Sequence, residues 1–190
     1  MKNLKSPLYR ICVDCPALHG KVQQELLPLT MKFTHLIEIN EPGNPLIAPL
    51  SREQLWRGLL MRVERPTLFQ LGLERCEITA RSESGLSRTL DFGNLVVRDQ
   101  VSFLPLQQVH YHVQQQDLIP TSDLRMTIEE PQPGALFVRF EYDDHQSAQE
   151  SPEEAFYNDF RRDAYKESDI DTIKMIRQLA QEGQLDAPLQ

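Results

Sequence analysis

A charged pair lies within a short, otherwise apolar β-hairpin that the sequence predicts. The segment RTLDFGNLVVRDQVSF, residues 88–103, has glycine at the first position of a two-residue loop, as a type II′ turn prefers. If Gly93 and Asn94 form this loop, Arg88 faces Asp99 directly across the two strands. Because strand side chains alternate between faces, the pair shares one face with six apolar residues. These are Leu86, Leu90, Phe92, Leu95, Val97 and Val101.

An arginine and an aspartate on an apolar face could bind a ligand or transfer a proton. The planar guanidinium of Arg88 could bind a carboxylate, phenolate or enolate oxygen of a small molecule. Asp99 would orient Arg88 and, if a ligand desolvated it, could also accept a proton. The alternative is structural, since cross-strand pairs of this kind often only satisfy each other. A change of register by one residue would also move both side chains to solvent.

Aromatic residues from other segments could complete a wall around this pair. Tyr111, Phe140 and Tyr142 fall on the same face of later strands, and Trp56, Phe156 and Phe160 lie on helices that could close the space. An apolar wall with a few polar groups is typical of a small-molecule site. We therefore predict a ligand-binding wall of eight residues and assign no catalytic residue. The eight are Trp56, Arg88, Asp99, Tyr111, Phe140, Tyr142, Phe156 and Phe160.

Two further groups have the residue types of metal ligands but not the number that a metal site needs. His110 and His112 share one strand face, yet Tyr111 between them takes the inward face. Both histidines are therefore expected on the outer face, with no third ligand evident. Cys12 and Cys15, followed by a histidine, resemble half of a zinc site, and zinc requires four ligands. We predict no metal and no cofactor.

The elements that would position these residues follow a simple order. Period-two alternation predicts seven strands, separated by Gly, Pro, Ser or polar clusters. They cover residues 33–40, 73–81, 86–92, 95–104, 109–114, 123–130 and 135–142. Ser51 and Gln54 form a capping-box pattern that starts a helix, which Pro66 ends or kinks; residues 67–71 could form a second short helix. A long final helix is predicted from Pro152 to Gly183.

This order predicts an α+β chain with a helix-grip fold. A seven-stranded curved antiparallel sheet can bury its apolar face by wrapping around the long C-terminal helix. One or two short helices follow the first strand. A curved sheet around a helix often leaves a space between the two, and such spaces hold ligands.

Several sequence blocks resemble one protein family. They are LSREQLWRGLL from Leu50, Arg65-Pro66, Phe69, Cys76-Glu-Ile, RTLDFG from Arg88, and RDQV from Arg98. Together they resemble the AtaL-like family, a former domain of unknown function in the SRPBCC (START/Bet v 1-like) superfamily, over about residues 31–180. The resemblance implies the helix-grip fold and an internal cavity but no particular reaction. The wider superfamily includes lipid and hormone carriers, polyketide cyclases and aromatases, and chaperone activators.

Composition limits the kinds of molecule that the protein is expected to bind and the compartment in which it is expected to fold. Twenty Lys and Arg against 28 Asp and Glu give a net charge of −8, which argues against nucleic acid, because its binders need a basic surface. No apolar run reaches the length of a membrane span. Three cysteines form no disulfide framework, so a reducing cytoplasm is expected. We predict an N-terminal extension over residues 1–30, disordered or arising from a misassigned start, one domain over 31–183 and a tail over 184–190.

Three functions are compatible with these features. The first is binding of a small hydrophobic molecule with a polar or anionic end in a cavity between the sheet and the C-terminal helix. The second is a cyclase, isomerase or lyase that acts on a polyketide-like or aromatic substrate, so whether the chain is an enzyme stays open. The third is a protein-interaction module. Composition leaves the oligomeric state open as well.

Overall fold

The computed structural model describes residues 32–117, 119–145 and 152–186, with backbone alone for 152–157. The predicted extension over residues 1–30, with Cys12 and Cys15, lies outside them. Within the described residues the chain forms two α-helices, α2 (Arg52–Glu64) and α3 (Pro152–Gln181), and a 3-10 turn, η1 (Pro66–Leu68), follows α2. The predicted helix after the first strand and the long C-terminal helix are both confirmed.

Seven strands form one antiparallel sheet, as the alternation predicts. They are β1 (Lys32–Glu38), β2 (Arg75–Ser82), β3 (Gly85–Asp91), β4 (Val96–Leu104), β5 (Gln108–Val113), β6 (Ser122–Gln132) and β7 (Ala135–Asp143). Their order in the sheet is β1-β7-β6-β5-β4-β3-β2. The strands from β2 to β7 thus follow one another as a meander, and β1 is added at the far edge beside β7.

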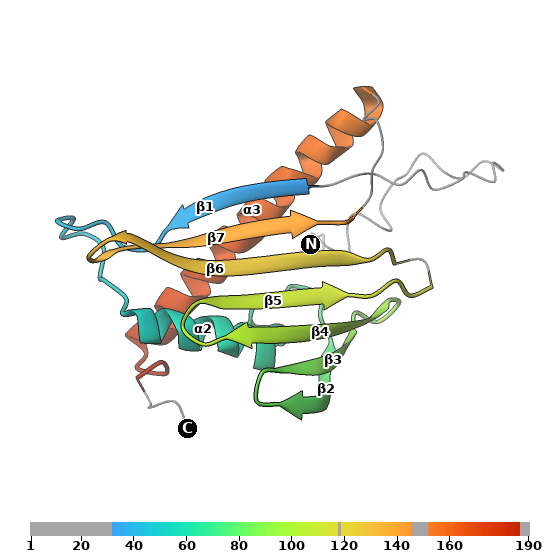
Figure 1. The fold of residues 1–190 in the computed structure, drawn as a ribbon, viewed down its shortest axis with the longest axis horizontal. Coiled ribbons are helices and arrows are strands. Elements are labelled where there is room, and N and C mark those ends of the chain that lie inside the picture. Colours follow the sequence, from blue (N-terminus) through green and yellow to red (C-terminus); the bar gives the residue numbers. More distant parts are fainter. Residues whose placement is uncertain (1–31, 118, 146–151, 187–190) are drawn as a thin grey trace, which may run out of the picture.

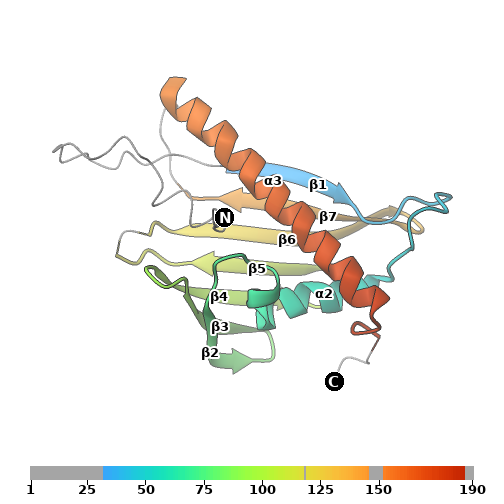
Figure 2. The ribbon, with the colours of Figure 1, turned by 180° about the vertical axis from the view of Figure 1, so that it is seen from behind.

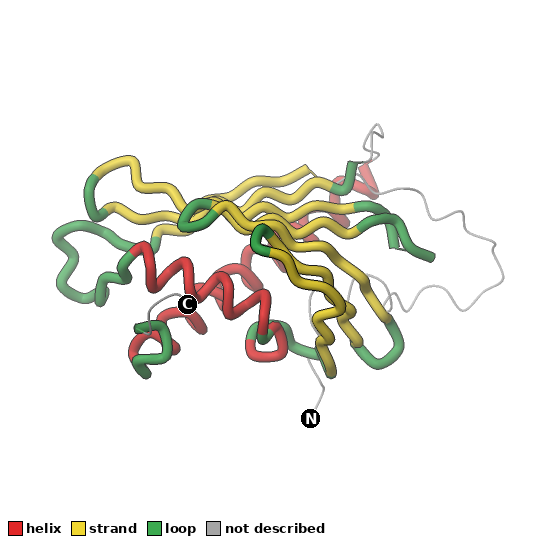
Figure 3. Tube along the Cα trace, turned by 60° about the horizontal axis from the view of Figure 1, so that its bottom comes forward, coloured by secondary structure: helices red, strands yellow, loops and turns green. Residues whose placement is uncertain are grey.

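Both helices pack against the same face of the sheet. Figure 2 shows α3 running diagonally across the strands, with α2 beside its C-terminal half. Figure 1, from the opposite side, shows the other sheet face in front of the helices. Figure 3 shows the sheet curving around the helical layer, which is the helix-grip arrangement. The face that the helices cover is called the inner face below, and the opposite one the outer face.

The hairpin of β3 and β4 has the predicted register. Arg88 pairs with Asp99, Leu90 with Val97 and Leu86 with Val101. Phe92 donates a backbone hydrogen bond to Leu95 across the turn, and Gly93 has the positive φ of 88° that this turn requires. The charged pair therefore lies on the inner face.

Helix α2 begins at the capping box that the sequence predicts. The Ser51 hydroxyl accepts a hydrogen bond from the backbone N–H of Gln54 at 3.1 Å. The side-chain oxygen of Gln54 accepts one from the backbone N–H of Ser51 at 2.9 Å. These bonds satisfy two amide groups that a helix start leaves without partners. The helix then buries its apolar stripe against the sheet and α3. The buried members are Leu55, Trp56, Leu59 and Val63.

The packed part of the chain extends past the predicted boundary at residue 183. Gly183 ends α3 with a positive φ of 71°, and the chain turns back toward α2. Leu185 is fully buried in the main core. The side-chain amide of Gln54 donates a hydrogen bond to the Asp186 carboxylate at 2.8 Å. Residues up to Asp186 thus belong to the packed domain, and 187–190 lie outside the described residues.

Candidate functional site

Arg88 and Asp99 form a buried ion pair on the inner face, joined by two hydrogen bonds. We call this pair the clamp. Arg88 is 2% exposed, and its Nε and one terminal nitrogen donate to the two carboxylate oxygens of Asp99, the Nε bond measuring 3.0 Å. The other terminal nitrogen donates to the Val63 carbonyl at 2.7 Å. Burial works to lower the pKa of Arg88, but the hydrogen bond to Asp99 and the negative charge of Asp99, with smaller effects of Tyr111 and Cys76, together raise it. All three donor nitrogens are thus engaged, and the pair ties the β3–β4 hairpin to the end of α2.

Tyr111, on β5, lies against two guanidinium groups. The central carbons of Arg62 and Arg88 are each 5.2 Å from the centre of its ring, a cation–π distance. The side chain is 7% exposed, and its hydroxyl has no hydrogen-bond partner among the described residues. A buried hydroxyl without a partner is costly, so this atom marks a place where an acceptor or donor is missing.

Arg62, in the last turn of α2, is a second buried cation with few partners. It is 5% exposed, and its Nε donates to the Thr172 hydroxyl at 3.3 Å. No described residue accepts a hydrogen bond from its two terminal nitrogens or forms an ion pair with it. Burial works to lower its pKa, but nearby Tyr111, Tyr142 and Asp169 outweigh this and raise it. The Tyr111 hydroxyl contributes to that rise, although the two groups do not meet in hydrogen-bond geometry.

A buried carboxylate from α3 forms a second polar group in the interior. Asp169 is fully buried and accepts a hydrogen bond from the Tyr142 hydroxyl, which lies 2.8 Å from both carboxylate oxygens. His35 Nε2, on β1, is 2.8 Å from one of the same oxygens. Burial raises the pKa of Asp169 and raises that of Tyr142 well above its ordinary value. The group joins α3 to β1 and β7 and places an acid–base pair in the interior.

The structure brings together most of the predicted wall but not all of it. Arg88, Asp99, Trp56, Tyr111 and Phe140 are all buried in the interior, and Trp56 packs edge-on against a phenylalanine of β4. Tyr142 lies on the same face, but its hydroxyl bonds to Asp169 and not to the Arg88–Asp99 pair.

Phe160 corrects the prediction, because it is 58% exposed and does not close the interior. It precedes the buried Asp169 by nine residues, about two and a half helical turns, and so points away from the sheet. The side chain of Phe156 lies outside the described residues.

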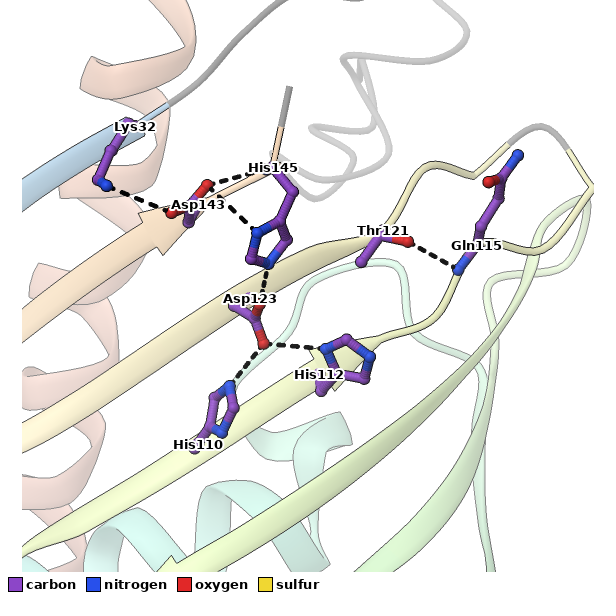
Figure 4. A network of polar contacts seen from close by, with 8 residues as sticks. All are labelled: Lys32, His110, His112, Gln115, Thr121, Asp123, Asp143 and His145. Carbon is purple, nitrogen blue, oxygen red and sulfur yellow. Dashed lines mark hydrogen bonds and ion pairs between the residues drawn. The ribbon is translucent and has the colours of Figure 1, made fainter. Parts of the chain in front are cut away.

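A second polar cluster lies on the outer face, near the ends of β5, β6 and β7 (Figure 4). The carboxylate of Asp123 accepts hydrogen bonds from His110 Nε2 at 2.5 Å, His112 Nδ1 at 3.0 Å and His145 Nε2. Burial alone would raise the pKa of Asp123, but these bonds outweigh it and lower the pKa to about 2. The bond to Asp123 in turn raises the pKa of His145. We call these four residues the histidine cluster.

The histidine cluster refines one prediction. His110 and His112 do lie on the outer face, as alternation requires, but they are partly buried against Asp123 and are not a simply solvated pair. Across residues 32–117, 119–145 and 158–186, no three His, Cys, Asp or Glu side chains are arranged to hold a metal ion. Over the same part of the chain, no helix is long and apolar enough to cross a membrane.

Sequence reasoning missed Arg62 and Asp169, although both carried a signal. Arg62 is three residues after Leu59 and falls within the apolar stripe of α2. Asp169 precedes Ile173 by four residues on α3 and shares its buried side. A charged residue inside a helical apolar stripe was the observable clue.

The comparisons with known proteins agree with this architecture. A family model described as acetylaranotin biosynthesis cluster protein L (AtaL) matches residues 37–183. No curated protein matches the chain. Among solved structures, the di-domain aromatase/cyclase StfQ from the steffimycin biosynthetic pathway superposes with a TM-score of 0.59 at 10% identity. The match covers 80% of this chain and 52% of StfQ, so the chain spans about half of that protein.

Two further solved structures have the same fold over most of this chain. Human STARD10 superposes with a TM-score of 0.55 at 13% identity, over 80% of this chain and 66% of its own. A START superfamily protein from Mycobacterium smegmatis gives 0.54 at 14% identity, over 78% of this chain and 98% of its own. At such identities the likeness establishes the fold. Since the family model covers most of the chain, the chain belongs to the AtaL family, and its fold is the START-like helix-grip fold.

Proposed function

We propose that this protein binds a small hydrophobic molecule with a polar or anionic end between the inner face of the sheet and its two helices. The observation that carries the proposal is the pair of buried guanidinium groups, Arg62 and Arg88, beside Tyr111 on an otherwise apolar wall. Buried cations are costly unless something offsets their charge. Asp99 does so for Arg88, and the anionic end of a ligand would do so for Arg62.

The fold supports the same proposal. Solved proteins with this arrangement include one named as an aromatase/cyclase and another named as a START superfamily protein. Apolar pockets with a few convergent polar groups are the usual form of a small-molecule site. The core that contains Tyr111 is otherwise largely apolar, and Leu59, Val63, Val101, Val109 and Met126 are all buried in it.

Native mass spectrometry of the protein purified from its own host tests the proposal. We expect a discrete additional mass that is released when the protein is unfolded in acid, and the released molecule should be hydrophobic. The chain has a single tryptophan, Trp56, which is 3% exposed, so its fluorescence should report an occupied interior. If no adduct appears and no hydrophobic probe changes the Trp56 emission or the melting temperature, the proposal is wrong.

A second candidate is an enzyme of cyclase, isomerase or lyase type, and the Asp169 group favours it. A buried carboxylate with a raised pKa, bonded to Tyr142 and His35, has the properties of a general base. A polyketide-like or aromatic substrate held by Arg62 would supply an acidic C–H bond. Once a substrate is found, Asp169→Asn should lower the rate while leaving binding nearly unchanged. An unchanged rate would remove Asp169 from the chemistry.

A further inference from the structure

We infer that Arg62 and the hydroxyl of Tyr111 together form a carboxylate-binding subsite, and that Arg88 does not contact the ligand. The inference rests on the proposed function and specifies the class of ligand: a hydrophobic molecule with a single carboxylate. It also assigns the two buried arginines different roles, which their sequence positions do not distinguish.

The first step is the contrast between the two guanidinium groups. Arg88 uses its Nε and both terminal nitrogens on Asp99 and the Val63 carbonyl. Arg62 uses only its Nε, on Thr172, and its two terminal nitrogens have no acceptor among the described residues. A guanidinium offers its terminal nitrogens as a fork that matches the two oxygens of a carboxylate. Within the described part of the chain, the two terminal nitrogens of Arg62 are therefore a donor pair without an acceptor.

The second step is the Tyr111 hydroxyl, an independent observation at the same place. It is buried, it has no hydrogen-bond partner in the described part of the chain, and its ring lies 5.2 Å from the Arg62 guanidinium. A phenol can donate one further hydrogen bond to a carboxylate oxygen held by the arginine. One ligand carboxylate could thus accept hydrogen bonds from the buried Tyr111 hydroxyl and from the two terminal nitrogens of Arg62.

The third step is the surrounding charge. The nearest carboxylates are engaged elsewhere: Asp99 with Arg88, and Asp169 with Tyr142 and His35. Asp169 is close enough to help raise the pKa of Arg62 but forms no ion pair with it. A ligand with one negative charge would complete the pairing. A second negative charge on the ligand would have no further cation to pair with and would be disfavoured by Asp169 nearby.

The test compares acids with neutral amides of the same shape at pH 7.5. The probes are 2-naphthoate against 2-naphthamide and decanoate against decanamide, titrated by calorimetry and by Trp56 fluorescence. We expect each acid to bind about 10- to 100-fold more tightly than its amide, as for a hydrogen-bonded charge. Arg62→Met should abolish this preference, leaving the acid no tighter than the amide. Arg65→Met is the matched control, since Arg65 is exposed at the end of the same helix, and it should leave the preference intact.

Tyr111→Phe keeps the test decisive if Arg62→Met fails to fold. Because its hydroxyl has no partner, its removal should leave the melting temperature unchanged or higher, while the acid loses about 3- to 10-fold in affinity. Acids and amides that bind equally to the wild type would overturn the inference, with water alone satisfying Arg62, but would leave the proposed function standing. If no probe of either kind binds and no adduct is carried, the proposed function itself fails.

Discussion

At the scale of single residues, Arg88 and Arg62 carry the same charge on the same wall, and their partners decide what each can do. Arg88 is held at three nitrogens by Asp99 and the Val63 carbonyl. Arg62 is held at one. The first arrangement is a structural clamp and the second leaves capacity for a ligand. A buried arginine is thus informative only when its hydrogen bonds are counted.

Arg88→Met is expected to lower the free energy of unfolding by about 3–5 kcal/mol, because it strands the Asp99 carboxylate in the interior. The double variant Arg88→Met/Asp99→Leu should recover most of this loss, since no charge is then left unpaired. Arg98→Met, at an exposed neighbouring position, should change stability by no more than about 0.5 kcal/mol. Urea unfolding measures all three. A small loss for Arg88→Met would mean that water reaches the pair.

The histidine cluster should make the free energy of unfolding depend on pH in two ranges, one at acid pH and one above pH 6.5. The pKa of Asp123 is lowered from 3.8 to about 2 in the folded protein, so its stabilisation is complete above 3.8 and is lost as the pH falls through 2. The pKa of His145 is raised from 6.5, so its contribution is complete below 6.5 and is lost as the pH rises through the raised value.

Asp123→Asn should therefore destabilise the protein by about 1 kcal/mol at pH 5.5, a figure reduced for solvent screening because the histidine partners are partly exposed, and by less at pH 9. Urea unfolding of wild type and variant at the two pH values gives this difference directly. His145→Ala should show the same pattern with a smaller amplitude, because the side chain is partly exposed. A loss that is equal at both pH values would show that the histidines contribute as neutral hydrogen-bond donors.

The residues of the site differ in how far the sequence reveals them. The Arg88–Asp99 pair was predictable, because a two-residue turn fixes the register of a hairpin. Arg62 and Asp169 meet the site from helices whose rotation and crossing angle only packing determines. His145 lies two residues beyond the end of β7, where the strand alternation no longer predicts the direction of a side chain. Contacts within one hairpin could therefore be predicted from the sequence, and contacts between distant elements could not.

At the scale of elements, the contact between α2 and α3 rests on Gly58. A Cβ atom at this position would lie 2.5 Å from Cγ2 and 2.8 Å from Cγ1 of Ile176, both on the buried side of α3. The glycine therefore lets the two helices approach closely. Arg62 lies one turn further along α2, so this contact also determines how far Arg62 is from the inner face of the sheet.

Gly58→Ala is expected to destabilise the protein by about 1–3 kcal/mol through overpacking. A loss of stability would indicate the close helix contact, because a Gly→Ala change in a solvent-exposed helix stabilises the helix by about 1 kcal/mol. Combining it with Ile176→Ala should cost less than the sum of the single changes, since each relieves the strain or the cavity of the other. Denaturant unfolding of the four proteins in the cycle measures the coupling. An additive result would place the helices further apart.

The elements themselves were largely predictable, and their orientations were not. All seven strands and both helices form where alternation, capping and helical periodicity indicate. The boundaries shift by a few residues, as with β2, which begins at Arg75 and not at residue 73. The side of α3 that faces the sheet was misjudged at Phe160, because an apolar residue near a helix end fits more than one stripe.

At the scale of the whole molecule, the domain is closed at its C-terminal end by Leu185. This side chain is fully buried although it lies beyond the helix, in a segment whose sequence shows no pattern. Leu185→Ala should lower the free energy of unfolding by about 2–5 kcal/mol. Leu46→Ala, at a position that is 92% exposed, is the control and should change little. Thermal and urea unfolding test both, and a small loss for Leu185→Ala would restore the boundary at 183.

The place of β1 in the sheet has a consequence for how the protein is made. β1 pairs only with β7, and His35 lies opposite Phe140, about 100 residues later in the chain, so its partner strand leaves the ribosome last of the seven. At typical translation rates β1 waits about 5–20 s for that strand. During this interval its edge and its apolar side chains are open to other chains. Nascent β1 is therefore the segment on which we expect a ribosome-associated chaperone to act.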